Sequence, residues 1–546
     1  MENVTQGLAA IDWVIFAVYA LIIVSVGLTV ASKNKSSTEG YFLAGKSIPW
    51  WAVGASLIAA NISAEQFIGM SGSGFAIGLG ISAYEWMAAI TLILVAKFFM
   101  PIFIEKGIYT IPEFVEKRFN KTLKTILAVF WLCLYIFVNL SSVLYLGGTA
   151  LQIIMGVPMM YTIIGLALFA LVYSVYGGLS SVVWTDVIQV AVLIIGGFAT
   201  TYLAVSFVGG DAGFFGGFSH MMDVAPDHFK MILDKSNPQF NNLPGISVLI
   251  GGLWVANLYY WGFNQYIIQR TFAAKSLDEA QKGLAFAGFL KLITPLIVVL
   301  PGIAAYVIIN DPVLQEQLSK AYGAIVTNPD IMPSAEHADK AYPWVANFLP
   351  VGFKVLVFAA LAAAIVSSLA SMLNSTATIF TMDIYKEYID KNASELKLVN
   401  IGRLTAVVAL VIAVFVAPML GVIDQAFQYI QEYTGLVSPG ILAVFLTGLF
   451  YKKATAKGAI YGVLASIPIA LLLKFLPLDM PFMDQMMYTF ILSLATIVLV
   501  SLASSDKDDD DNAIVLTGKT FKTSGGFAAA AYAIMIITAA LYALFW

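Results

Sequence analysis

The chain has 546 residues, of which 60% are hydrophobic and 11% are charged, and its formal net charge at pH 7 is −4. A soluble domain carries about a quarter of charged residues, so this composition excludes an ordinary soluble protein. Apolar runs of 18 or more residues recur along the whole chain, which is typical of an all-α polytopic membrane protein. Neither a nucleic-acid-binding signature nor a set of catalytic residues is visible, so we do not expect an enzyme.

We predict 14 membrane-spanning helices in a single transmembrane domain that occupies residues 1–546. In chain order the spans are 10–31, 50–75, 79–104, 125–151, 158–176, 183–208, 246–270, 281–309, 345–382, 402–420, 422–451, 457–476, 482–505 and 524–546. The first span is long and has no small-residue cleavage site, so we expect it to remain as an anchor.

The distribution of Lys and Arg between the loops predicts the orientation of the chain. If the N-terminus lies outside, most loop Lys and Arg fall in the inside loops. The outside loops then contain only four lysines, Lys230, Lys235, Lys320 and Lys340. We therefore expect both termini to lie outside.

The second span contains a polar stretch, "AANISAEQFIGMSGSG", within an apolar frame. Asn61, Ser63, Glu65 and Gln66 lie within six residues of one another. Irregular backbone at membrane depth survives only where protein buries it or water reaches it. We predict a broken helix, whose freed carbonyl oxygens suit a hard cation such as Na⁺.

The seventh span has a similar interruption in "LWVANLYYWGFNQYIIQR", residues 253–270. Here Asn257, Gly262, Asn264 and Gln265 interrupt the apolar pattern. The two broken spans are five spans apart, which is the pattern of an inverted repeat of five plus five helices.

The repeat divides the chain into four parts. The first repeat would occupy residues 50–208 and the second residues 246–451. The helices at 10–31 and 457–546 would be peripheral.

The ninth span contains small and hydroxyl residues on one helical face. Ala364, Ser367 and Ser368 have the spacing i, i+3 and i+4, which places them together. With the carbonyls of Ala59 and Ile62, they would offer five neutral oxygens, which fit a monovalent alkali cation better than a divalent one. Close helix packing explains the same small residues equally well.

Ionisable residues within the spans mark a site by default, and each needs a partner. They include Glu65, Glu85, Asp186 and Lys291. Glu85 and Lys291 together form a neutral set, which is either a structural ion pair or part of a site for a polar solute.

The polar and aromatic residues of the spans fit a sugar, which has many hydroxyls and one apolar ring face. Hydroxyls would bind the polar side chains of Gln66, Glu85, Asn257, Lys291 and Gln431. The apolar face would lie on Tyr260 and Trp261. An amino acid is not excluded by the same set.

Five long segments carry a resemblance to a known family. They are "SLIAANISAEQFIGMSGSG", "YGGLSSVVWTDVIQ", "GGLWVANLYYWGFNQYIIQRT", "AAIVSSLASMLNSTATIFTMDIYK" and "FQYIQEYTGLVSPGILAVF". The chain resembles the sodium:solute symporter family over essentially its whole length. The resemblance implies a leucine-transporter-like fold in a bacterial inner membrane. It also implies that Na⁺ is the coupling ion and that one Na⁺ drives one sugar inward.

The resemblance also implies roles for individual residues. The sodium ligands are the carbonyls of Ala59, Ile62 and Ala364 and the hydroxyls of Ser367 and Ser368, with Asp186 near the inner sodium path. The sugar contacts are Gln66, Glu85, Asn257, Lys291 and Gln431. The inner gate is Tyr260, with Trp261 and Asn264 beside it, and the outer lid is formed by Met70, Tyr84 and Phe427.

One position departs from the family pattern. The resemblance places a serine where this chain has Ala88, in "YEWMA", so one hydroxyl that would contact the sugar is absent. The preference between galactose and glucose therefore stays open, as does the oligomeric state. A symporter for myo-inositol or sialic acid, or a passive sugar facilitator, is the alternative.

Overall fold

A computed structural model of the chain describes residues 10–31, 37–323, 326, 328, 331–347, 353–420, 426–476, 479–504, 512–518 and 520–546. The predicted spans 345–382, 422–451 and 482–505 therefore each include residues outside the described part. Within the described part the chain forms helices and turns without a β-strand, and one isolated bridge joins Ile48 to Ala274. The predicted all-α fold is confirmed.

The first part of the chain forms the helices that precede the second break. They are α1 (Ala10–Ala31), α2 (Thr38–Leu43), η1 (Ala44–Lys46), α3 (Trp50–Asn61), η2 (Glu65–Met70), α4 (Ser71–Ala76), η3 (Leu79–Ser82), α5 (Ala83–Leu94), η4 (Val95–Phe99), α6 (Met100–Glu105), α7 (Ile111–Arg118), α8 (Lys121–Cys133), η5 (Leu134–Leu140), α9 (Ser141–Met155), α10 (Met159–Gly209), η6 (Gly210–Ala212), α11 (Gly213–Val224) and η7 (Pro226–Phe229).

The remaining helices follow the long loop that begins after residue 229. They are α12 (Ser247–Ile250), α13 (Gly252–Phe263), α14 (Gln265–Phe272), α15 (Leu277–Asn310), α16 (Pro312–Tyr322), η9 (Ala338–Lys340), α17 (Ala341–Ala346), α18 (Phe353–Ile379), η10 (Phe380–Ile389), α19 (Glu395–Val416), η11 (Ala417–Leu420), α20 (Ala426–Gly435), α21 (Ser438–Phe450), α22 (Ala456–Phe475), α23 (Phe482–Ala503) and α25 (Gly525–Leu544).

Ten helical stretches of the described chain are long and apolar enough to cross a membrane. They coincide with ten of the predicted spans. The predicted spans 50–75 and 246–270 are interrupted, and the predicted spans 158–176 and 422–451 contain the shorter apolar helices Met159–Val172 and Ser438–Phe450. The chain is therefore a multi-pass membrane protein, while the number of 14 spans stays a prediction.

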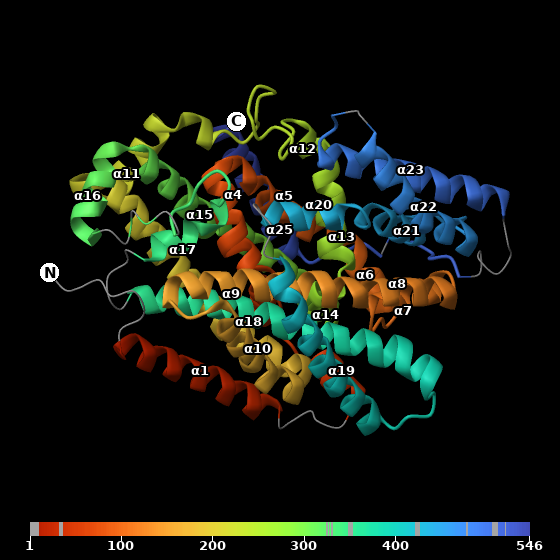
Figure 1. The fold of residues 1–546 in the computed structure, drawn as a ribbon. Helices are drawn as coiled ribbons and strands as arrows, with labels where there is room; N and C mark the ends of the chain where they lie inside the picture. The colour runs from red at the N-terminus through yellow and green to blue at the C-terminus, as the bar shows by residue number, and fades with distance from the viewer. Residues whose placement is uncertain are drawn as a thin grey trace.

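The helices differ in how deeply they are buried. In the most apolar window of α18 and η10, 94% of the residues are buried, whereas in α1 only 11% are. α18 packs against α10, α3 and α9, and α15 packs against α3, α4 and α5. Figure 1 shows α1 along one edge of the molecule and α22 and α23 along the opposite edge.

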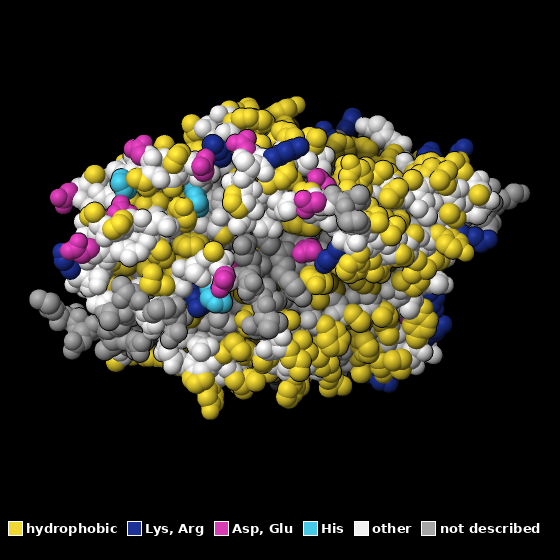
Figure 2. Space-filling view, turned by 45° about the horizontal axis from the view of Figure 1, so that its top comes forward, with side chains coloured by type: hydrophobic (Ala, Val, Ile, Leu, Met, Phe, Trp, Pro, Cys, Tyr) yellow, Lys and Arg dark blue, Asp and Glu magenta, His cyan; other side chains and the backbone are white. Residues whose placement is uncertain are grey.

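The outer surface exposes many apolar side chains. Large hydrophobic side chains are exposed on α1, α10, α19, α22, α23 and α25. On the face in Figure 2, hydrophobic side chains cover the lower and right-hand parts, while acidic and histidine side chains lie mainly on the left. Exposed apolar side chains on so many helices are expected where lipid tails contact the protein.

The second span is broken, as predicted. α3 ends at Asn61, and Ile62 has an extended conformation with φ −74° and ψ 93°. A π-helical segment, η2, then leads into α4. π-helical segments inside longer helices are frequent at functional sites.

The seventh span is also broken, as predicted. α13 ends at Phe263, and Asn264 is extended with φ −86° and ψ 116° before α14 begins at Gln265. The hydroxyl of Tyr135 donates a hydrogen bond of 2.5 Å to Asn264 Oδ1. The break is therefore joined to the fourth predicted span.

Candidate functional site

One cavity lies between the broken second span, the broken seventh span, α5, α15 and α20. Its lining includes all the residues predicted to bind the solute: Gln66, Glu85, Asn257, Tyr260, Lys291 and Gln431. It also includes Tyr84, Trp261 and Phe427 from the predicted gates. Residues that are far apart in the sequence are thus brought to one place.

Glu85 and Lys291 form an ion pair in the wall of this cavity. The ammonium of Lys291 donates to Glu85 Oε2, and both side chains are almost fully buried. The same ammonium lies 5.2 Å from the centre of the Trp261 ring, within the range of a cation–π contact. Because each charge has its partner, the pair can lie inside the membrane.

Several polar atoms in the cavity wall lack a hydrogen bond to any described residue. They are Asn61 Oδ1, Glu65 Oε1, the hydroxyl of Tyr84, Asn257 Nδ2 and Ser438 Oγ. Buried polar atoms in native proteins are nearly always paired, so such a group of unpaired atoms indicates a polar ligand or ordered water. The set contains both donors and acceptors, as hydroxyl groups require.

Aromatic side chains close two sides of the cavity. The rings of Tyr84 and Phe427 meet edge to face, with their centres 5.1 Å apart. Phe427 also lies directly against Gly69, because a Cβ atom added to that glycine would be 2.8 Å from the Phe427 Cβ. A larger residue at position 69 would therefore displace Phe427.

Tyr260 closes another side and is fixed by two hydrogen bonds. Its hydroxyl accepts from Asn61 Nδ2 at 3.0 Å and lies 2.6 Å from the hydroxyl of Tyr266. Its ring meets the Trp261 ring nearly at right angles. The first bond joins the seventh span directly to the end of α3 at the other break.

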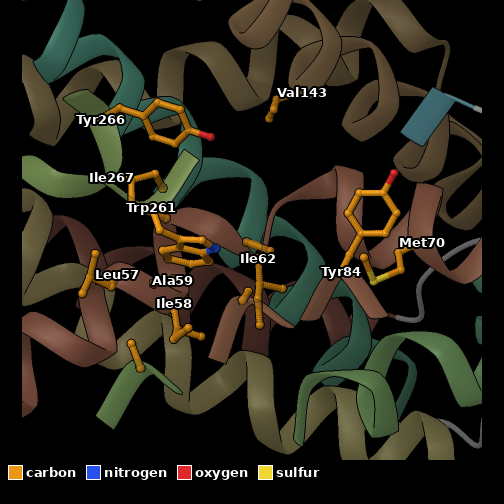
Figure 3. Packing of buried hydrophobic residues seen from close by; sticks show 14 of the residues in the cluster. Leu57, Ile58, Ala59, Ile62, Met70, Tyr84, Val143, Trp261, Tyr266 and Ile267 are labelled. Carbon is orange, nitrogen blue, oxygen red and sulfur yellow. The ribbon is translucent and has the colours of Figure 1, made fainter. Parts of the chain in front are cut away.

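The break in the second span leaves backbone carbonyls for other donors. The Ser63 amide donates to Gln66 Oε1 at 3.0 Å instead of continuing the helix toward Ala59. Ser368 Oγ on α18 donates to the carbonyl of Ala60 at 2.9 Å. Figure 3 shows Ala59 and Ile62 of this segment among the buried side chains of the core.

Asp186 lies next to the predicted sodium ligand Ser367, whose hydroxyl donates to Asp186 Oδ1 at 2.5 Å. Ser56 donates to the other carboxylate oxygen at 2.5 Å. The guanidinium of Arg270 lies 3.6 Å from Asp186 and donates to Ser56 at 2.6 Å.

Arg270 has a role in the core that the sequence did not indicate. Arg270 is the last residue of the predicted span 246–270, yet its side chain is only 1% exposed. Arg118, which lies between two predicted spans, is also buried, and it donates to four carbonyls at the end of α21 and just after it, from Gly448 to Ala454. The requirement that a buried Asp186 have a cationic partner is the signal that could have identified Arg270.

Two predicted gate residues do not line the cavity. Met70 is fully buried in the core, and Asn264 forms the break in the seventh span.

The described residues contain no group of three or more His, Cys, Asp or Glu that could hold a metal ion. At the first break, the carbonyl of Ala60 and the hydroxyl of Ser368 lie together.

Comparison with known proteins identifies the family. Residues 41–466 match the model described as the sodium:solute symporter family. The chain belongs to this family. It is a symporter, and Na⁺ is its coupling ion.

Curated relatives of this symporter match it along most of their length. A protein of Vibrio parahaemolyticus named sodium/glucose cotransporter is 70% identical, and the match covers 100% of each chain. The human sodium/myo-inositol cotransporter 2 is 34% identical, with 91% of this chain and 77% of the human protein covered.

The fold of this symporter resembles that of solved transporters. A Na⁺-coupled sialic acid symporter in a substrate-bound, outward-open state matches with a TM-score of 0.78 at 23% identity, over 91% of this chain and 98% of the other. A transporter of the nucleobase-cation-symport-1 family in a closed conformation matches with a TM-score of 0.53 at 14% identity, over 88% and 98%.

Proposed function

We propose that this symporter carries a neutral monosaccharide, galactose or glucose, into the cell with Na⁺. The observation that carries the proposal is the cavity, where an ion pair, four side-chain amides and unpaired polar atoms meet aromatic rings. Such a wall complements the hydroxyls and the apolar face of one sugar ring. The 70% identity to a protein named sodium/glucose cotransporter supports the same substrate class.

For the solute we assign contacts to Gln66, Glu85, Asn257, Lys291 and Gln431, with Tyr260 below the ring. Gln66 Oε1 accepts from Ser63, and its NH₂ group makes no hydrogen bond with the residues that the structure describes, so it can donate to a sugar oxygen. The Glu85 carboxylate accepts from a hydroxyl, and Lys291 donates to another.

For Na⁺ we assign the carbonyls of Ala59, Ile62 and Ala364 and the hydroxyls of Ser367 and Ser368. Two observations support this set. Ser368 already contacts the broken segment at Ala60, and Ser367 contacts Asp186, which would receive the ion as it leaves. Neutral oxygen ligands favour Na⁺ over a divalent ion.

Transport would follow alternating access between two five-helix repeats, residues 50–208 and 246–451. Na⁺ binding joins the broken second span to α18, the solute enters, and Tyr84, Phe427 and Met70 close the outer side. Movement of Tyr260, with Trp261 and Asn264 beside it, then opens the inner side. Breaks in spans five apart support the repeat.

The membrane arrangement belongs to the same proposal. Both termini lie outside, the protein is in the inner membrane of a bacterium, and the helices at 10–31 and 457–546 are peripheral. A membrane potential of about 100 mV supplies about 2.3 kcal/mol for one charge moved across. That energy corresponds to about fiftyfold accumulation of a neutral solute.

The test is uptake into proteoliposomes with an inward Na⁺ gradient or a matched K⁺ gradient. We expect galactose or glucose to accumulate only with Na⁺. Equal uptake under both gradients would indicate a passive facilitator. Accumulation of myo-inositol or sialic acid alone would assign the site to those solutes.

A further inference from the structure

Glu65 is a buried carboxylate in the cavity that the proposed solute contacts do not use. It begins the π-helical segment η2, three residues after the break at Ile62. Its side chain is 9% exposed and lines the cavity. Its Oε1 atom makes no hydrogen bond with the residues that the structure describes.

The other deeply buried charges near the cavity are paired. Glu85 is paired with Lys291, and Asp186 with Arg270. Glu65 forms no ion pair within the described chain. When Glu65 is ionised, the cavity carries one negative charge in excess, because Lys291 is already neutralised by Glu85.

The atoms beside Glu65 favour a hydroxylated ligand. Asn61 Nδ2 donates to Tyr260, which leaves Asn61 Oδ1 as a second unpaired acceptor in the same wall. Two acceptors together call for a donor, and a sugar hydroxyl supplies one. A carboxylate on the solute would supply none.

We propose that Glu65 is a specificity-determining residue, which accepts a hydrogen bond from a hydroxyl of the solute and excludes anionic solutes by its charge. The inference rests on the proposed function and deepens it, because it restricts the substrate to neutral polyols. A repulsive group is an effective source of specificity, since it weakens the wrong ligand as well as binding the right one.

Two substitutions separate the effect of the charge of Glu65 from the effect of its side-chain length. Glu65→Gln keeps the size of the side chain and removes the charge. Glu65→Asp keeps the charge and withdraws the carboxylate from the solute. Glu105→Gln, at an exposed position at the end of α6, is the matched control for loss of one carboxylate.

The experiment is competition binding in saturating Na⁺ at alkaline pH, so that Glu65 is ionised. The ligands are galactose or glucose and the corresponding hexuronic acid, in which a carboxylate replaces the terminal CH₂OH. For Glu65→Gln we expect binding of the neutral sugar to weaken about tenfold. We also expect the preference for the neutral sugar over the acid to fall by at least about tenfold. Glu65→Asp should lose affinity for the neutral sugar and still exclude the acid, and Glu105→Gln should behave as the wild type.

The outcomes separate this inference from the proposed function. If the wild type binds no neutral sugar in Na⁺, the proposed function fails. If the wild type binds sugar and Glu65→Gln has the same affinity and the same preference, the inference about Glu65 is wrong. A Glu65→Gln variant that weakens Na⁺ binding alone would also overturn it, because Glu65 would then act on the ion. Size-exclusion profiles and thermal unfolding in detergent establish that each variant is folded.

Discussion

The two broken helices satisfy their freed polar groups in different ways. At the first break, the Ala60 carbonyl accepts from Ser368 on α18, and the side chains of Asn61 and Glu65 keep unpaired oxygens in the cavity. At the second break, Asn264 accepts from Tyr135, and Gln265 Oε1 accepts from the amide of Ile111.

The first break therefore remains available for ligands, whereas the second is anchored to protein. The anchoring continues into α14, where Arg270 contacts Ser56 on α3 and Asp186 on α10. The same guanidinium also donates a hydrogen bond to the hydroxyl of Ser371 on α18. A break in a membrane helix can thus be a binding element or a fixed joint, depending on which side chains surround it.

The largest expected effect is a loss of stability at the second break, where Arg270 is paired with Asp186. Arg270→Met leaves Asp186 buried without its cation, which typically costs about 3–5 kcal/mol. We expect a large fall in the thermal unfolding temperature in detergent. The double variant Arg270→Met with Asp186→Asn removes both charges and should recover much of the loss. Equal stability of all three proteins would mean that the pair does not hold this joint.

A second effect concerns the solute wall. Glu85→Gln removes the charged partner of Lys291 and a charged acceptor for a sugar hydroxyl. We expect solute binding to weaken by about 1.5–3 kcal/mol, or roughly 10- to 150-fold. Isothermal titration with sugar at fixed Na⁺ measures this loss, and titration with Na⁺ should give the wild-type affinity. A loss confined to Na⁺ binding would move Glu85 out of the solute site.

A third prediction tests Na⁺ binding at the first break through Ser368. Ser368→Ala removes the hydroxyl that reaches Ala60, and we expect Na⁺ binding to weaken by about 1–1.5 kcal/mol, about five- to tenfold. The Na⁺ concentration for half-maximal uptake is the measurement. Thr376→Val is the control, because Thr376 is buried on the same helix and donates only within it, to Met372. Equal effects of the two substitutions would contradict a role of Ser368 in the ion site.

The sequence predicted these breaks because polar residues in an apolar frame are rare and visible. The pairing of Glu85 with Lys291 followed from the need to pair buried charges, whereas the place of Gln66 beside them was implied by the family resemblance. The contact of Ser368 with Ala60 could not be predicted, because it depends on the exact packing of α18 against α3. Arg270 was missed because a basic residue at the end of a span looks the same whether it reaches the inside water or turns into the core.

The smallest expected effect is at Ala88, which lines the cavity and is buried. Restoring a hydroxyl with Ala88→Ser gives the solute one more partner on α5, next to Glu85. The gain is small, about 0.5–1 kcal/mol or two- to fivefold, because the new hydroxyl must first give up a bond to water or to its own helix. We expect either a higher galactose affinity or a changed ratio of galactose to glucose affinity. Competition binding of the two sugars to the wild type and to Ala88→Ser measures both.

The control is Ala89, the next residue, which is buried but does not line the cavity. Ala89→Ser should therefore raise neither affinity. If the two serine variants gave the same result, position 88 would not face the sugar, and the site would be wrong at this edge of the cavity.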